Sequence, residues 1–287
     1  MIKIGTKQIG KDAPIYVIAE IGINHNGSVE NAKQLIAVAA EAGCDAVKFQ
    51  KRTLDVVYSE TELLAERESV FGSTNGDLKR GLEFGVSEYE EIDAFCKEIS
   101  MDWFASCWDE QSVDFLERFD PPCYKIASAS LTDDNLLQHH ARTGKPVILS
   151  TGMSDLPMIE HAVRQLDSEN LALLHCTSTY PSRIEEINLR GIDSLQDHFP
   201  EIPVGFSGHE TGLPTTLAAA ALGARVIERH ITLDRAQWGS DQAASLEPNG
   251  LIRLVKGIRA IERALGDGDI KIYDSERPII EKLRRVG

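Results

Sequence analysis

Eight short apolar runs, each followed by a polar or amphipathic segment long enough for a helix, predict an α/β fold of the TIM (β/α)8 barrel class. The runs are rich in Val, Ile, Ala and Phe with few polar interruptions, as expected of parallel strands buried on both faces. An open doubly wound sheet is the competing fold. Such a sheet usually carries a glycine-rich phosphate turn after its first strand, whereas here GINHNG (residues 22–27) stands in that place.

The expected strands leave room for a helix between neighbours. In order, they are residues 15–22, 46–50, 102–107, 124–128, 146–151, 171–177, 203–208 and 224–231. Capping signals delimit the helices: Ser28 begins the first one and Gly43 ends it. Ser87 and Glu90 form a capping box at the start of another. Further helices are expected at 109–119, at 135–143, from 155, at 191–198, in the Ala-rich stretch before 224, and at 250–265.

Three segments lie outside this repeat. Residues 1–14 contain IKIGTKQIG, whose alternation predicts a short β-hairpin that closes the amino-terminal end of the barrel. Residues 52–86 are a long polar excursion after the second strand, and residues 267–287 are a tail too short for a further domain. We therefore interpret residues 1–287 as a single barrel domain.

The composition excludes several classes of function. A formal charge of −15 argues against a surface for nucleic acid or an anionic membrane, so neither is expected as a partner. The five cysteines have no metal-site spacing and are expected to be reduced thiols. The amino terminus lacks the apolar core of a signal peptide, and no apolar run is long enough to span a membrane. A cytoplasmic location is expected.

Polar residues stand at the carboxyl ends of most expected strands, where a barrel of this class carries its active site. They are Glu20, Asn24, Lys48, Gln50, Ser106, Lys125, Ser128, Ser150, Thr151, His175, Thr177, Ser207, His209, Glu228 and His230. Because a charged side chain without a partner is costly to bury, charges on so many strands imply one shared polar site.

Two pairs within this set indicate particular chemistry. His209 and His230 end consecutive strands, which suits a divalent metal with open positions for water and substrate; each His hydrogen-bonding only a neighbouring strand is the alternative. Lys48 and Lys125, with nearby hydroxyl groups, suit a phosphate and a carboxylate. A Schiff-base lysine is the competing interpretation, but it leaves the histidine pair without a role.

Seven ordered motifs carry a resemblance to a known family: AEIGINHNG, AVKFQ, YKIAS, KPVILSTGM, LLHCTSTYP, VGFSGH and IERHITLD. In this order and spacing the chain resembles the sialic acid synthases, which include N-acetylneuraminate, legionaminic and pseudaminic acid synthases. The resemblance covers residues 15–265 and implies a transferase with a TIM barrel. Such an enzyme condenses phosphoenolpyruvate (PEP) with an N-acylated amino sugar such as N-acetylmannosamine, and it releases phosphate by C–O cleavage.

The resemblance also implies residue roles. His209 and His230 would bind Mn²⁺, with Mg²⁺ or Co²⁺ as alternatives, and an ion there would polarise the aldehyde of the sugar. PEP would be held by Lys48, Lys125, Ser128, Tyr180 and Ser207, and Ser178 stands where the family usually has a phosphate-binding Asn. The hydroxyl of Ser106 is expected to contact the substrate as well. The sugar side would be lined by Glu20, Gln50, Glu228 and Asp241, with Glu20 stabilising positive charge that develops at C2 of PEP.

The sequence departs from the family pattern in places. The family commonly has Asp where Gly208 stands between Ser207 and His209, so the work of that carboxylate is expected to be absent or moved to Glu210. The printed sequence stops at Gly287, before the antifreeze-like domain that commonly follows the barrel and crosses a homodimer. A homodimer is still expected, with a different interface. The alternative functions are a PEP-dependent synthase of another 3-deoxy-keto sugar acid and a non-catalytic barrel that binds sugar or PEP.

Overall fold

The structure, a computed structural model, describes residues 1–166 and 168–286. Eight parallel strands close into a barrel in the order β10-β11-β12-β3-β4-β7-β8-β9. The TIM barrel prediction is confirmed, and each expected strand is present. The barrel strands are β3 (Tyr16–Gly22), β4 (Ala46–Lys51), β7 (Asp102–Cys107), β8 (Tyr124–Ile126), β9 (Val147–Ser150), β10 (Leu171–Cys176), β11 (Val204–Gly208) and β12 (Val226–His230).

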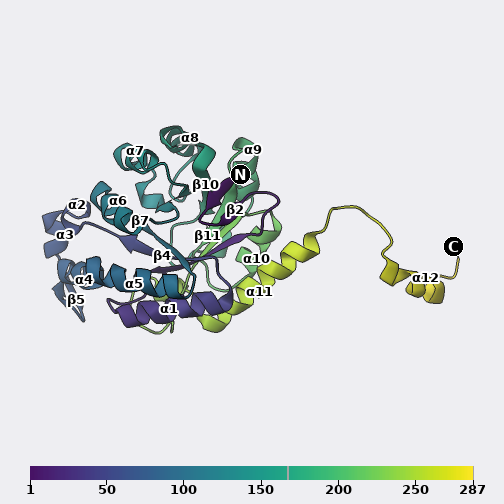
Figure 1. Cartoon of the computed structure of the whole chain (residues 1–287), viewed down its shortest axis with the longest axis horizontal. Helices are drawn as coiled ribbons and strands as arrows, with labels where there is room; N and C mark the ends of the chain where they lie inside the picture. Colours follow the sequence, from purple (N-terminus) through teal and green to yellow (C-terminus); the bar gives the residue numbers. More distant parts are fainter. Residues whose placement is uncertain (167, 287) are drawn as a thin grey trace.

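Helices surround the strands, as Figure 1 shows. They are α1 (Val29–Ala42), α5 (Val86–Glu98), α6 (Glu110–Leu116), α7 (Asp134–Arg142), α8 (Leu156–Gln165), α9 (Gly191–His198), α10 (Pro214–Ala221) and α11 (Pro248–Leu265). Ser28 and Gly43 cap α1 as expected. The capping box expected at Ser87 and Glu90 is wrong, because α5 begins earlier and Glu88 accepts a hydrogen bond from the backbone of Gly85.

Two layers of apolar side chains hold the barrel together. The larger layer packs between the strands and the helices and includes Val47, Phe49, Leu35 and Ile258. The smaller layer fills the barrel near the amino-terminal ends of the strands with residues from several of them, such as Ile18 and Phe104. Burial of these side chains contributes most of the free energy of folding.

The expected amino-terminal hairpin is present as β1 (Ile2–Ile4) paired with β2 (Lys7–Ile9). Its residues Ile2, Ile4 and Ile9 are buried in the same cluster as the interior of the barrel. The hairpin therefore closes that end of the barrel, as its alternating pattern predicts.

The polar excursion after β4 folds into short elements: α2 (Leu54–Val57), α3 (Glu60–Leu64), β5 (Glu66–Ser69), β6 (Gly72–Thr74) and α4 (Asn75–Leu82). Strands β5 and β6 pair as an antiparallel hairpin. Phe71, at the tip of this hairpin, meets Trp238 from the loop after β12 edge to face, with ring centroids 6.3 Å apart. The excursion thus joins the loops at the carboxyl-terminal face, where the site lies.

Beyond α11 the chain runs away from the barrel to α12 (Arg277–Leu283), drawn in yellow in Figure 1. The apolar side chains of Ile270, Ile279 and Leu283 on this tail are exposed. Among the described residues, no helix is both long and apolar enough to cross a membrane.

Candidate active site

A polar cavity opens at the carboxyl ends of the barrel strands. Its wall includes twelve of the residues that the sequence nominated: Glu20, Lys48, Gln50, Ser106, Lys125, Ser128, Ser178, Tyr180, Ser207, His209, Glu228 and His230. Successive side chains of a strand point alternately into the barrel and toward the helices. The parallel register brings the carboxyl ends of the strands to one level. Asp241 does not line the cavity, but its carboxylate lies 3.8 Å from Nδ1 of His230.

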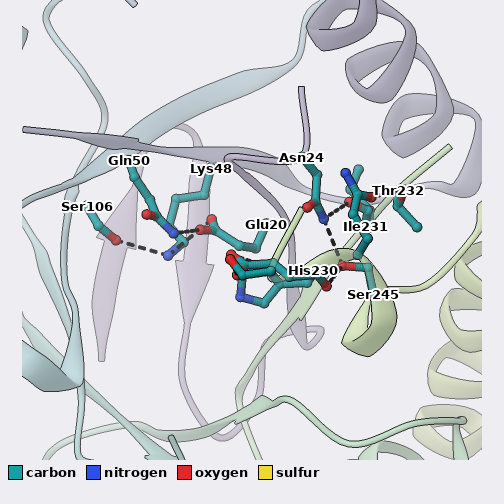
Figure 2. A network of polar contacts seen from close by, with 12 residues as sticks. Glu20, Asn24, Lys48, Gln50, Ser106, His230, Ile231, Thr232 and Ser245 are labelled. Carbon is teal, nitrogen blue, oxygen red and sulfur yellow. Dashed lines mark hydrogen bonds and ion pairs between the residues drawn. The ribbon is translucent and has the colours of Figure 1, made fainter. Parts of the chain in front are cut away.

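Lys48 stands between two carboxylates at the centre of this site. Its Nζ lies 3.1 Å from Oε2 of Glu20 and 3.4 Å from Oε1 of Glu228, and it donates a hydrogen bond to Oγ of Ser106 at 3.0 Å. Figure 2 shows Lys48 reaching toward Glu20 and Ser106. Ser207 donates to the same oxygen of Glu228 at 3.1 Å. All of these side chains are buried, so each charge depends on its neighbours rather than on water.

The two carboxylates have opposite pKa shifts. Burial raises the pKa of Glu20, which Lys48 opposes and Glu228 reinforces. For Glu228, the attraction of Lys48 and Lys125 outweighs burial, and its pKa falls below the usual value. Burial also opposes the charge on Lys48, but Glu20 and Glu228 outweigh it and raise the pKa of the amine. The site therefore contains one ionised carboxylate, one carboxyl that titrates near neutrality, and one persistent cation.

Gln50 and Arg52 extend this network toward the rim. The amide nitrogen of Gln50 donates to Oε1 of Glu20 at 3.1 Å, and its oxygen accepts from the guanidinium of Arg52. Because Arg52 can only donate, it fixes which end of the amide faces Glu20. The guanidinium of Arg52 stacks on the Trp108 ring at 4.3 Å, and Trp108 lines the cavity.

Lys125 and a group of hydroxyls form the opposite wall. Nζ of Lys125 donates to Oγ of Ser150 at 2.7 Å. Ser128 accepts a hydrogen bond from the backbone N–H of Gly152 at 3.0 Å. A Cβ atom at Gly152 would lie 2.8 Å from Oγ of Ser128 and still closer to Oγ of Ser178, so only glycine lets both hydroxyls approach. Burial lowers the pKa of Lys125 to about 8, against the attraction of Glu228. This wall has the donors that a phosphate or carboxylate requires.

The two histidines meet beside Tyr180. The ring centroids of His209 and His230 are 5.4 Å apart, and the ring of Tyr180 lies 4.1 Å from that of His209. Nδ1 of His209 is 2.9 Å from the carbonyl oxygen of Thr177, an arrangement in which Nδ1 carries the proton and Nε2 keeps its lone pair. Burial lowers the pKa of His230, and its Nδ1 is buried without a hydrogen-bond partner.

This pair provides part of the donor set of a catalytic metal centre. His209 has an unprotonated Nε2, and His230 is a neutral imidazole with a ring nitrogen that has no hydrogen-bond partner; a divalent ion binds such nitrogens. Across residues 1–166 and 168–286, however, no group of three or more His, Cys, Asp or Glu residues is placed to hold an ion. The pair therefore fits an ion whose remaining ligands are water and substrate.

Asn24 connects the histidine side of the site to the loop after β12, as Figure 2 shows. Its Nδ2 donates to the carbonyl oxygen of Ile231 and to Oγ of Ser245, both at 2.8 Å. Ser245 in turn donates to the backbone oxygen of Asp241 at 2.6 Å. This chain of hydrogen bonds fixes Asp241 beside His230.

Ser150, one of the polar strand ends expected from the sequence, also lines the cavity. The structure adds wall residues that the sequence did not nominate: Trp108, Ala127, Ala129, Met153 and Cys176. Cys176 is the last residue of β10, where the sequence pointed to its neighbours His175 and Thr177 instead. Cys176 approaches Ser128, Ser178 and Nδ1 of His209, each at 3.7 Å. Trp108 and Met153 lie in loops, where no periodic pattern marks them.

The sequence matches the NeuB family over residues 35–270. The chain belongs to this family. Its relatives include N-acetylneuraminate-9-phosphate synthase of Mus musculus, which is 40% identical over 279 residues that make up 96% of this chain and 78% of the mouse protein. N,N'-diacetyllegionaminic acid synthase of Legionella pneumophila is 36% identical, with 98% of this chain and 82% of that protein covered.

A solved structure confirms the likeness in three dimensions. The crystal structure of N-acetylneuraminic acid (sialic acid) synthetase from Leptospira borgpetersenii serovar Hardjo-bovis, in complex with citrate, superposes with a TM-score of 0.86 at 32% identity. The match covers 99% of this chain and 98% of the Leptospira chain. The resemblance inferred from the seven motifs is confirmed at the level of the family.

Proposed function

We propose that this protein condenses PEP with an N-acylated amino sugar of the N-acetylmannosamine type to form a nonulosonic acid and phosphate. The observation that carries the proposal is a cavity that has the amine of Lys125 and several hydroxyls on one wall and the carboxylates of Glu20 and Glu228 on another. The relatives named above are synthases of sialic and legionaminic acids, which supports the same reaction here.

PEP binds across the Lys125 wall in this proposal. Lys125, Ser128, Ser150 and Ser178 supply donors to one anionic group, and Lys48 and Ser106 reach the other. The ring of Tyr180 lies 4.1 Å from that of His209 and 5.6 Å from that of His230, at the edge of the space that PEP would occupy. Positioning both anionic groups fixes C3 of PEP, the nucleophilic carbon, toward the sugar.

The sugar binds on the side of Glu20 and Gln50, with Asp241 close to His230. C3 of PEP attacks the aldehyde carbon, a C–C bond forms, and positive charge develops at C2. The aldehyde oxygen becomes an alkoxide and takes up a proton, which is balanced by the proton that the added water releases in the next step. The carboxylates of Glu20 and Glu228 stabilise this charge. Water then adds to C2 and loses a proton, for which Glu20 is suited because burial brings its pKa toward neutrality. Breaking the bond between C2 and the bridging oxygen releases inorganic phosphate.

His209 and His230 are proposed to hold the divalent ion, Mn²⁺ or else Mg²⁺ or Co²⁺. When bound, such an ion supplies Lewis acidity toward the sugar carbonyl. The histidines contribute a neutral imidazole at His230 and a free Nε2 at His209, which Thr177 orients. The proposal also includes a cytoplasmic location, supported by five buried free cysteines, and a homodimer, which the resemblance to the sialic acid synthases implies.

Phosphate release from PEP, measured with a panel of aldoses and Mn²⁺, tests the proposal. We expect release with N-acylated amino sugars and none without an acceptor. PEP labelled with ¹⁸O at the bridging oxygen should deliver the label to phosphate. Release only with non-acylated aldoses would favour a synthase of another 3-deoxy-keto sugar acid, and no release with any aldose would favour a binding protein.

A further inference from the structure

A second buried ion pair lies on the other face of the two strands that carry the histidines. Nη1 of Arg229 donates to Oε1 of Glu210 at 3.0 Å, and Nη2 donates to the backbone oxygen of the same residue at 2.6 Å. Both side chains are 1% exposed. Thr215 and Thr216 donate to the same carboxylate oxygen at 2.6 and 2.7 Å. A buried pair with this many bonds holds its two backbone segments at one separation.

The position of this pair in the chain ties it to the site. Glu210 directly follows His209, and Arg229 directly precedes His230. Because side chains alternate along a strand, His230 faces the cavity while Arg229 faces α10. The pair thus joins the ends of β11 and β12 from behind, one residue away from each histidine.

Gly208 makes room for the carboxylate of Glu210. It stands opposite Arg229 in the register of β11 and β12. A Cβ atom there would lie 2.6 Å from Oε2 of Glu210, 2.7 Å from the ring of Phe206 and 3.0 Å from Cδ of Arg229. A larger residue fits only if both Glu210 and the ring of Phe206 move. The space that a side chain at position 208 would enter is already filled by a carboxylate from position 210.

We propose that Glu210 and Arg229 are positioning residues that set the separation of His209 and His230 for metal binding, with Gly208 as the glycine that this arrangement requires. The inference rests on the proposed metal site. Neither side chain lines the cavity, so the pair acts only through the histidines next to it. In the sequence Ser207–Glu210 the carboxylate stands at position 210 and not at position 208. The structure places this carboxylate behind the strands, paired with Arg229.

The test compares Arg229→Lys, Arg229→Met and Glu210→Gln with Arg259→Met. Arg259 forms a similar set of ion pairs, with Asp45 and Glu262, beside the hairpin end of the barrel, so its loss lowers stability without touching the histidines. Mn²⁺ alone is the probe, and its free concentration is measured by electron paramagnetic resonance. Each variant is measured at the same number of degrees below its own melting temperature. PEP affinity is measured separately by calorimetry without metal.

We expect Arg229→Met and Glu210→Gln to weaken Mn²⁺ binding by about 10- to 100-fold, while PEP affinity changes less than about twofold. Arg229→Lys should recover part of the loss, and Arg259→Met should leave Mn²⁺ affinity unchanged. Gly208→Ala alone should weaken Mn²⁺ binding. The same substitution should weaken Mn²⁺ binding less when it is added to Glu210→Ala.

Unchanged Mn²⁺ affinity in Arg229→Met and Glu210→Gln would overturn the inference, as would an equal loss in Arg259→Met. A wild type that binds no Mn²⁺ overturns it as well. Those results leave the proposed reaction intact if the wild type still releases phosphate from PEP with an amino sugar. The reaction itself is refuted only by the absence of that release.

Discussion

The ammonium group of Lys48 lies 3.1 Å from a carboxylate oxygen of Glu20, and both side chains are almost fully buried, at 4% and 1% exposure. Glu228 approaches the same ammonium group at 3.4 Å from β12, which lies on the far side of β3 from β4. Two carboxylates therefore share this cation, which makes the centre of the site sensitive to the loss of a single side chain.

Replacing Lys48 tests this dependence. Lys48→Met should abolish phosphate release and lower the free energy of unfolding at pH 8 by about 3–5 kcal/mol, because two buried carboxylates lose the cation that they share. Their pKa values rise in the folded variant, so protonation relieves the cost and the deficit shrinks as the pH falls toward 5. Denaturant unfolding at several pH values measures this. A deficit that is the same at pH 5 and pH 8 would contradict the pairing.

Lys125 predicts a pH dependence of PEP binding. Its folded-state pKa of about 8 lies below that of the free amine, so the charge is lost at moderately alkaline pH. The KM for PEP should rise by about tenfold per pH unit above pH 8, since PEP loses a cationic partner. Lys125→Met should bind PEP weakly at all pH values, and its KM for PEP should not rise further above pH 8.

The same shift fixes the sign of a stability effect. Because the folded state disfavours the charged amine, Lys125 costs stability below pH 8, and the cost is relieved as the pH rises toward the unfolded value. The free energy of unfolding of the wild type should therefore gain a contribution between about pH 8 and pH 10 that Lys125→Met lacks.

The histidine pair predicts a dependence on metal. Removal of divalent ions with a chelator should abolish turnover, and added Mn²⁺ should restore it. Mn²⁺ should also raise the melting temperature of the wild type, because an ion that binds only the folded state stabilises it. His209→Ala should lose both effects and more than about 100-fold in turnover. Full activity of the chelated wild type would exclude the metal assignment.

Asn24 predicts a selective effect on the sugar. Asn24→Ala removes its donors to Ile231 and Ser245 and should cost about 1–3 kcal/mol of folding free energy. Since Asp241 is then less fixed, the KM for the sugar should rise while the KM for PEP stays near the wild-type value. Asn26→Ala is the matched control, because Asn26 makes a longer bond of 3.4 Å to Gln237 in the same region. Equal changes in both KM values would contradict the assignment.

The strands and the polar residues at their carboxyl ends could be predicted because they depend on local signals in the sequence. Apolar runs such as residues 46–50 mark a strand wherever they occur, and parallel strands bring their carboxyl ends to one face. Lys48, Lys125, His209 and His230 were therefore placed at one mouth from the sequence, and the structure brings them together there. Their catalytic roles stay predictions until the experiments above are done.

Several local predictions failed or missed residues for physical reasons. The capping box at Ser87 was wrong because a backbone N–H at Gly85 competes for the same turn and takes Glu88 instead. Trp108 and Met153 were missed because loops carry no periodicity. Glu210 was a candidate for replacing a carboxylate at position 208, and the structure places it behind the strands with Arg229 rather than in the cavity.

The sequence alone determined the barrel, its closing hairpin and the family, since periodicity, capping residues and ordered motifs lie along the chain. Only the tertiary structure decided the partner of each charge. Lys48 joins Glu20 and Glu228 from three strands, and Arg229 meets Glu210 across the register of β11 and β12. These pairings depend on barrel closure and on the alternation of side chains along the strands, which bring residues far apart in sequence within a few ångströms of each other. Burial removes the water that would otherwise solvate each charge, so each charge needs a partner in the protein.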